Sequence, residues 1–186
     1  MKMLVLLSGG LDSAVVLAAC VQEHECISVG FDYGQKHLIE LDRAAQIAEW
    51  YKVPFRRIAL RPIPLVDDIV FSGRNLVMVA TAIAIAQAEG MDAVAFGCNE
   101  SDWARFADCR PAFWSAVRTA AEAYGVKVIT PLLHVWKGVV VEQARALGVP
   151  IELTWSCYSP QGDEPCGECL ACRTRNEACG LSQAIS

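Results

Sequence analysis

Short apolar, β-branched runs alternate with amphipathic helical stretches along most of the chain, which predicts an α/β fold. Strands separated by helices imply a parallel sheet, with helices on both faces and right-handed crossovers between the strands. The chain has 186 residues, of which 54% are apolar, so it is long enough for one domain with a full hydrophobic core.

The expected elements follow one another in a regular order. We expect strands at residues 3–7, 26–31, 55–60, 93–96 and 127–129, and helices at residues 13–22, 39–50, 76–89, 111–123 and 137–146. Gly148 and Pro150 end the last of these helices. From Thr154 prolines and glycines interleave with cysteines, until periodicity returns at about Leu170. The sequence therefore predicts a domain of residues 1–153 and a small C-terminal appendage of residues 154–186.

The net charge and the lengths of the apolar runs argue against nucleic-acid and membrane partners. The net charge is −5, with 21 acidic and 16 basic residues, so the totals favour a small substrate over a nucleic acid. No apolar run approaches the roughly 20 residues that span a bilayer, so no membrane partner is expected. The apolar start runs into glycines without a cleavage site, which favours a buried strand over a signal peptide. Nine cysteines, an odd number, then indicate a cytoplasmic protein without a disulfide framework.

A glycine-rich loop follows the first expected strand, where ligands bind in open α/β sheets. Gly9 and Gly10 permit backbone N–H groups to approach an anion closely, and Ser8 and Ser13 add hydroxyl donors. The lysine of a Walker loop and the G-x-G-x-x-G pattern of dinucleotide sites are both absent. The loop predicts an anion site, and the alternative is an ordinary strand–helix turn with Asp12 as N-cap.

The run Ser-Gly-Gly-Leu-Asp-Ser resembles the PP-loop of the ATP pyrophosphatases. The resemblance implies an adenine nucleotide alpha hydrolase-like, Rossmann-like fold and an enzyme that cleaves ATP between its α- and β-phosphates while adenylating a substrate. It also implies that Asp12 is catalytic, and that pyrophosphate and Mg²⁺ are held by Ser8, Gly9, Gly10, Leu11, Asp12 and Ser13.

Four cysteines near the C-terminus have the spacing of metal ligands. Cys157, Cys166, Cys169 and Cys172 supply four thiols within sixteen residues. Zinc takes four thiolates tetrahedrally in closed structural sites, so we expect one structural Zn²⁺ per chain. An iron–sulfur cluster and unligated cysteines are the alternatives. Cys179 lies seven residues beyond Cys172 and is expected to be an ordinary thiol.

Six further segments, taken in order, resemble the 7-cyano-7-deazaguanine synthase family from residue 3 to residue 173. They are residues 31–37 with Glu40, 73–75, 99–102, 108–111, 131–132 with Lys137, and 154–158 with Arg173. The resemblance implies that 7-carboxy-7-deazaguanine, ammonia and ATP give 7-cyano-7-deazaguanine, the nitrile preQ0 of queuosine biosynthesis. The implied intermediates are an adenylated carboxylate and an amide that a second ATP activates.

The same resemblance assigns residues to the two halves of the site. Lys137 is implied as a catalytic cation near the phosphates, and Arg74 and Asn75 as nucleotide-binding residues. The alternatives are a solvated lysine and a capped helix terminus. The implied substrate-binding residues are Tyr33, Lys36, Asp102, Asp108 and Arg110. For the last three, the alternative is a surface loop with local ion pairs. Family members are commonly dimers, which implies a homodimer.

The chain departs from the family pattern on the substrate side. Residues 61–73 form a shorter stretch than in the family, and residues 103–107 replace a different loop. These departures leave open a related enzyme that acts on another deazapurine or stops at the amide. Two more distant functions also stay open: a tRNA-modifying PP-loop ATPase and an inactive zinc-containing nucleotide-binding protein.

Overall fold

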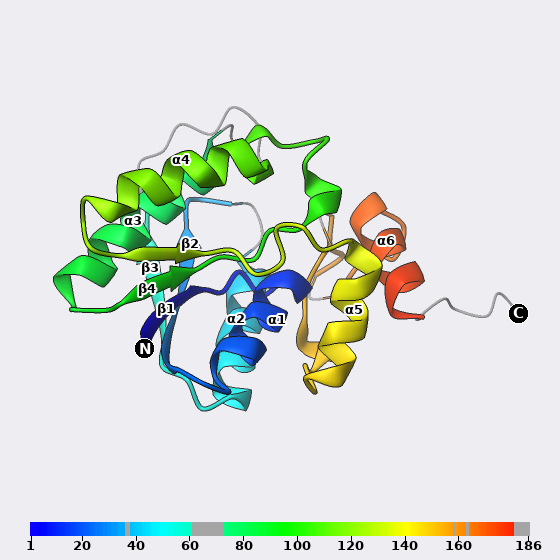
Figure 1. Cartoon of the computed structure of the whole chain (residues 1–186). Helices are drawn as coiled ribbons and strands as arrows, with labels where there is room; N and C mark the ends of the chain where they lie inside the picture. The colour runs from blue at the N-terminus through cyan, green and yellow to red at the C-terminus, as the bar shows by residue number, and fades with distance from the viewer. Residues whose placement is uncertain (36–37, 61–72, 158, 163, 181–186) are drawn as a thin grey trace, which may run out of the picture.

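The sheet is parallel, as the alternation of elements predicts. The computed structural model describes residues 1–35, 38–60, 73–157, 159–162 and 164–180. Its five strands lie in the order β3-β2-β1-β4-β5 (Figure 1). They are β1 (Lys2–Leu6), β2 (Glu25–Asp32), β3 (Phe55–Ala59), β4 (Ala93–Ala95) and β5 (Lys127–Ile129). The strand order reverses between β1 and β4, and open α/β sheets bind ligands at such a point.

Helices cover both faces of the sheet (Figure 1). One face packs against α1 (Leu11–Cys20), α2 (Ile39–Trp50) and α5 (Lys137–Ala146), and the other against α3 (Arg74–Ala88) and α4 (Pro111–Glu122). In β1, Met3 and Val5 pack on the first side, whereas Leu4 and Leu6 pack on the second. Because a strand alternates its side chains, a central strand covered on both faces must be apolar where it is buried, as β1 is at residues 3–6.

The predicted α/β fold is confirmed, with small differences at the element ends. The first helix begins at Leu11, two residues before the expected start, because Gly10 is already its extended N-cap. The third helix begins at Arg74, directly after Gly73, whose φ of +80° favours glycine. Three short 3₁₀ helices, at Glu100–Asp102, Ala107–Cys109 and Ile151–Leu153, were not expected.

The C-terminal segment packs on the domain and is not detached from it. Its helix α6 (Leu170–Cys179) contacts α5 (Figure 1). Cys179 is buried in the core cluster that contains α1 and α5, which agrees with its expected role as an ordinary thiol. Within the described ranges, no helix is both long enough and apolar enough to cross a membrane.

Candidate active site

The loop of residues 8–13, which we call the nucleotide loop after the ligand that its resemblance implies, is closely packed against its neighbours. Gly9 has a φ of +87°, and a Cβ atom there would collide with the carbonyl oxygen of Glu40. Across the sheet, a Cβ atom on Gly97 after β4 would lie 2.9 Å from the Asp12 carbon and the Ser13 nitrogen. Side chains are thus excluded on both sides, which brings β4 and α2 against the loop backbone.

Hydrogen bonds made by two serine hydroxyls join the backbone of the loop to itself. Ser13 Oγ accepts from the Ser8 N–H at 3.2 Å and donates to the Gly10 carbonyl at 2.9 Å. The two serine hydroxyls lie 3.1 Å apart, and the Gly10 N–H donates to Ser8 Oγ at 3.3 Å. The N-cap of α1 is Gly10 and not Asp12, so the capped-turn alternative is wrong in that detail. The loop places Asp12 in the first turn of α1, beside the positive end of the helix dipole.

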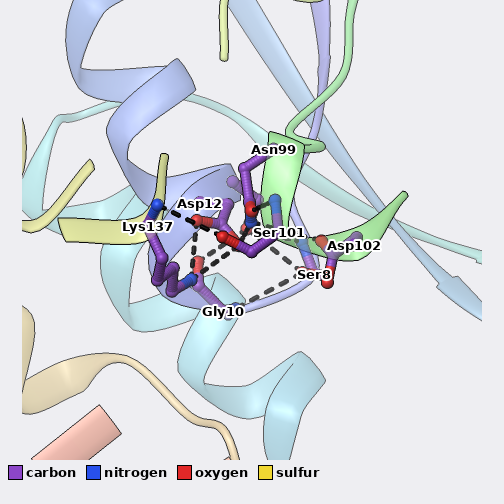
Figure 2. Close-up of polar contacts among 8 residues, drawn as sticks. Ser8, Gly10, Asp12, Asn99, Ser101, Asp102 and Lys137 are labelled. Atoms are coloured by element: carbon purple, nitrogen blue, oxygen red, sulfur yellow. Dashed lines mark hydrogen bonds and ion pairs between the residues drawn. The ribbon is translucent and has the colours of Figure 1, made fainter. Parts of the chain in front are cut away.

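Asp12 and Lys137, the two expected catalytic residues, are in direct contact (Figure 2). Lys137 Nζ lies 2.7 Å from Asp12 Oδ1 and 2.8 Å from Asp12 Oδ2. The side chains are only 25% and 22% exposed, so water screens this ion pair less than one on the surface. Lys137 begins α5, and its N–H donates to Ser101 Oγ at 3.3 Å.

Asn99 joins Asp12 to Asp102. Its Nδ2 lies 3.2 Å from Asp12 Oδ2 and 3.2 Å from Asp102 Oδ2 (Figure 2). Burial raises the pKa of Asp102, and the negative charge of Asp12 raises it further, while Lys137 opposes the shift. The expected substrate residue Asp102 therefore lies in the same polar cluster as the expected nucleotide residues. We call Asp12, Asn99, Asp102 and Lys137 the carboxylate cluster.

Arg74, Asn75, Tyr33 and Asp108 form a second group, the arginine cluster. Arg74 donates from Nη1 to the Tyr33 hydroxyl at 3.1 Å. The Asn75 N–H donates to Asp108 Oδ2 at 3.0 Å, which satisfies an amide at the start of α3. Burial disfavours the charge of Arg74, but Tyr33, Glu40 and Asp108 outweigh it and raise the pKa of Arg74. Arg74 and Asn75, expected on the nucleotide side, thus contact residues expected on the substrate side.

The remaining expected substrate residues are placed differently. Arg110 is exposed, and its Nε donates to the Trp103 carbonyl at 2.9 Å and not to a member of either cluster. Lys36 lies outside the described residues, as does the shortened stretch except for Gly73. Cys109 is buried, and burial raises the pKa of its thiol to about 12, so it is not prepared for nucleophilic chemistry.

Two site residues were missed as individual candidates, although both lie in segments of the family resemblance. Asn99 follows β4 at the switch point, a position that becomes visible only once the strand order is known. The Glu40 carboxylate accepts from Gln35 Nε2 at 3.2 Å, and the Glu40 backbone carbonyl lies where a side chain on Gly9 would be. Burial raises the pKa of Glu40, with Arg74 opposing. No sequence signal separates it from an ordinary acidic residue of a first helical turn.

The four expected metal ligands come together. The Sγ atoms of Cys157, Cys166, Cys169 and Cys172 all lie within 4.8 Å of one another. Burial raises the pKa of the Cys157 thiol, so a nearby cation is needed to favour its thiolate. Four clustered thiols and their partly buried positions fit a tetrahedral zinc site.

The four-cysteine cluster lies directly beside the nucleotide loop. Trp155, two residues before the first ligand, donates its N–H to the Gly9 carbonyl at 2.8 Å. Its Nε1 donates to the Cys157 carbonyl at 3.1 Å, and its ring packs with Cys172 and Ile39. Trp155 therefore connects the cysteine segment to the loop through one hydrogen bond, and a second hydrogen bond orients its ring within the segment.

Comparisons with known proteins agree with this arrangement. The family model "Queuosine biosynthesis protein QueC" matches residues 2–69 and 65–183. The 7-cyano-7-deazaguanine synthase of Synechococcus sp. (strain CC9311) is 36% identical, over 93% of this chain and 90% of its own. That of Prochlorococcus marinus (strain MIT 9303) is 34% identical, over 96% and 92%. The alignment with the first spans 207 positions, so this relative has residues that the chain lacks.

Solved structures show the fold alone. NMN synthetase from Francisella tularensis superposes with a TM-score of 0.61 at 17% identity, over 97% of this chain and 84% of that one. The U34-tRNA thiolase NcsA from Methanococcus maripaludis superposes with a TM-score of 0.62 at 17% identity, over 97% and 65%. The predicted nucleotide-hydrolase type of α/β fold is thereby confirmed.

Proposed function

The chain belongs to the family of queuosine biosynthesis protein QueC, and we propose that it is an ATP-dependent carbon–nitrogen ligase that makes 7-cyano-7-deazaguanine. The substrates are 7-carboxy-7-deazaguanine, ammonia and ATP. The carboxylate attacks the α-phosphorus of ATP and releases pyrophosphate. Ammonia then displaces AMP to give the amide, and the amide oxygen attacks a second ATP. That oxygen leaves with the second AMP, and the nitrile forms.

The observation that carries this proposal is the contact of Asp12 and Lys137 beside a closed glycine loop at the switch point. The N-terminus of α1 and the loop N–H groups suit the pyrophosphate part of ATP. Lys137 stabilises the charge that develops on the phosphates. Asp12 is the residue that would hold Mg²⁺, which supplies charge neutralisation of the phosphates. Carboxylate oxygens are ligands that Mg²⁺ prefers, and the Asp12 carboxylate is only 22% exposed.

The substrate half is supported by the two clusters that flank the loop. Asp102 and Asp108 are carboxylates that can accept from the N–H groups of a guanine-like base. Tyr33, Arg74 and Asn75 add hydrogen-bond donors near Asp108. Arg74 donates to the Tyr33 hydroxyl, and the Asn75 N–H donates to Asp108. Arg110 can pair with the substrate carboxylate only if its side chain leaves the Trp103 carbonyl.

The four-cysteine cluster is proposed to hold one structural Zn²⁺. Four thiolates leave no open position for a reacting water, so the ion stabilises the segment and takes no part in the chemistry. The cytoplasmic location is proposed because nine cysteines, an odd number, argue against a disulfide framework. The family resemblance also supports a homodimer, which sedimentation would test.

The deciding experiment incubates the protein with ATP, Mg²⁺, ammonia and 7-carboxy-7-deazaguanine and identifies the products by mass. We expect the nitrile with two pyrophosphates per product. An amide as the end product would favour the truncated reaction, which the altered residues 103–107 make worth testing. Release of no pyrophosphate would contradict the proposal and favour a nucleotide-binding protein without turnover.

A further inference from the structure

Asn99 is almost completely buried where β4 meets the nucleotide loop. It is 2% exposed and is the N-cap of the 3₁₀ helix Glu100–Asp102. Gly97, two residues earlier, lies so close to the backbone of Asp12 and Ser13 that no side chain would fit between them. This close approach, together with burial, places the Asn99 side chain directly beside the start of α1.

The orientation of the Asn99 amide follows from its partners. The Ser101 backbone N–H lies 2.8 Å from Asn99 Oδ1, and because a backbone N–H only donates, that atom must be the oxygen. The NH₂ group then faces the two carboxylates, with one hydrogen for each. Both donors and the acceptor of the amide are in use, and no other neutral side chain in Figure 2 donates to both carboxylates.

A neutral double donor suits this position. Asp12 and Asp102 repel each other, which contributes to the raised pKa of Asp102. Asn99 stabilises both charges and directs one oxygen of each, yet it carries no charge that would compete with Lys137 for a phosphate. A lysine or arginine in its place would bind the phosphate itself, and an aspartate would add a third negative charge.

We propose that Asn99 is a positioning residue that fixes the nucleotide carboxylate, Asp12, and the substrate carboxylate, Asp102, in one geometry. It aligns the α-phosphate of ATP with the carboxylate or amide oxygen that attacks it. This role rests on the proposed function, because it assigns Asp12 to the nucleotide and Asp102 to the substrate. Asn99 does not react; it acts through the two aspartates.

The first test measures steady-state kinetics of Asn99→Ala, with Gln46→Ala as a matched control. Gln46 carries an amide on the exposed face of α2, where its Oε1 accepts from Arg43 Nη1, and it belongs to neither cluster. We expect kcat for pyrophosphate release to fall roughly 30- to 100-fold in Asn99→Ala, with less than about a 5-fold change in either KM, because misalignment acts on the transition state. The control should stay within about 2-fold of the wild type. An unchanged kcat in folded Asn99→Ala would overturn the proposal.

Asn99→Asp provides a readout that a purely structural role would not change. At low pH the protonated carboxyl of this variant can still donate to one neighbour, whereas its ionised form places three carboxylates together. The ratio of the activity of Asn99→Asp to that of the wild type, measured in the same buffers, should therefore fall as the pH rises through the pKa of the new carboxyl. Parallel pH profiles for variant and wild type would contradict the positioning role.

A double-mutant cycle tests Asn99 even if the proposed substrate is wrong. The affinity for ATP with Mg²⁺ is measured by calorimetry for the wild type, Asn99→Ala, Asp102→Asn and the double variant. We expect the effects of the single changes to be non-additive. The fold-change in ATP affinity caused by Asp102→Asn should be at least about 3-fold smaller in the Asn99→Ala background than in the wild type. Additive effects overturn the coupling. Coupling without turnover of 7-carboxy-7-deazaguanine retains the role of Asn99 and rejects only the proposed reaction.

Discussion

The nucleotide loop and the four-cysteine cluster lie next to each other but are held in place by different means. The loop is fixed by the fold: glycines packed against α2 and β4, and serine hydroxyls that bond the loop backbone. The described residues from Thr154 to Cys169 form no α-helix and no named strand, and they carry three of the four converging thiols, the fourth being Cys172 in α6. The loop thus takes its geometry from the sheet, whereas the cysteine segment would take its geometry from the Zn²⁺ that we propose it binds.

The sharpest way to isolate the loop is Asp12→Ala, which leaves the fold and the cysteines in place. We expect pyrophosphate release to fall by about 1,000-fold, because the carboxylate that would hold Mg²⁺ and that contacts Lys137 is lost. Zinc content and melting temperature should stay near the wild-type values. An undiminished rate would show that Asp12 is not the metal partner of the nucleotide.

Cys169→Ser tests the opposite region and should affect stability before chemistry. Loss of one ligand should remove most of the metal and lower the unfolding free energy by about 3 kcal/mol, or Tm by roughly 10 °C. Elemental analysis should find about one zinc per wild-type chain, and iron would indicate the cluster alternative. The control is Cys179→Ser, at the end of α6, where the thiol lies in the core and not in the cluster. Equal metal loss in both variants would contradict the assignment of ligands.

Gly9→Ala and Gly10→Ala compare two glycines within the loop. At Gly9 the φ is +87° and the new Cβ would collide with the Glu40 carbonyl, so we expect a loss of about 2–3 kcal/mol in unfolding free energy. At Gly10 the nearest atom would be Ser8 Oγ at 3.5 Å, an ordinary contact, so the loss should stay below about 1 kcal/mol. Chemical denaturation of both variants checks the difference. Equal losses would mean that close packing does not shape the loop.

The smallest expected effect belongs to Trp155→Phe, which weakens the connection between the two regions. The ring packing and the backbone bond to Gly9 remain, while the Nε1 bond to the Cys157 carbonyl is lost. We expect about 1 kcal/mol lower stability and roughly 3-fold weaker ATP binding, measured by calorimetry. If ATP affinity stays unchanged while stability falls, the segment supports the loop only passively.

The sequence was sufficient for the features that depend on local order along the chain. The position of residues 8–13 after an apolar strand predicted the loop, and the spacing of Cys157, Cys166, Cys169 and Cys172 predicted their convergence. The family resemblance placed Lys137 near the phosphates, but it did not predict the direct contact between Asp12 and Lys137. It follows physically from the sheet, because β1 and β4 are neighbours and the segment after β5 returns beside them.

The parts that could not be predicted depend on side-chain contacts between distant segments. Asn99 lies between two carboxylates only because the strand order reverses beside β1, and an alternating pattern gives no strand order. Arg74 pairs with Tyr33 because α3 begins beside the end of β2, which its own helix terminus does not reveal. Both cases concern residues whose partners lie far away in the sequence.

The hydrogen bond from the Trp155 N–H to the Gly9 carbonyl has a consequence for folding. It joins two residues separated by most of the chain, so it carries a large loop-closure entropy and raises the contact order of the nucleotide site. The serine bonds within residues 8–13 are local and can form early. The local bonds of the loop should therefore form early in folding, and its bond to Trp155 should form late. ATP affinity is then expected to develop in the slowest refolding phase, together with metal uptake.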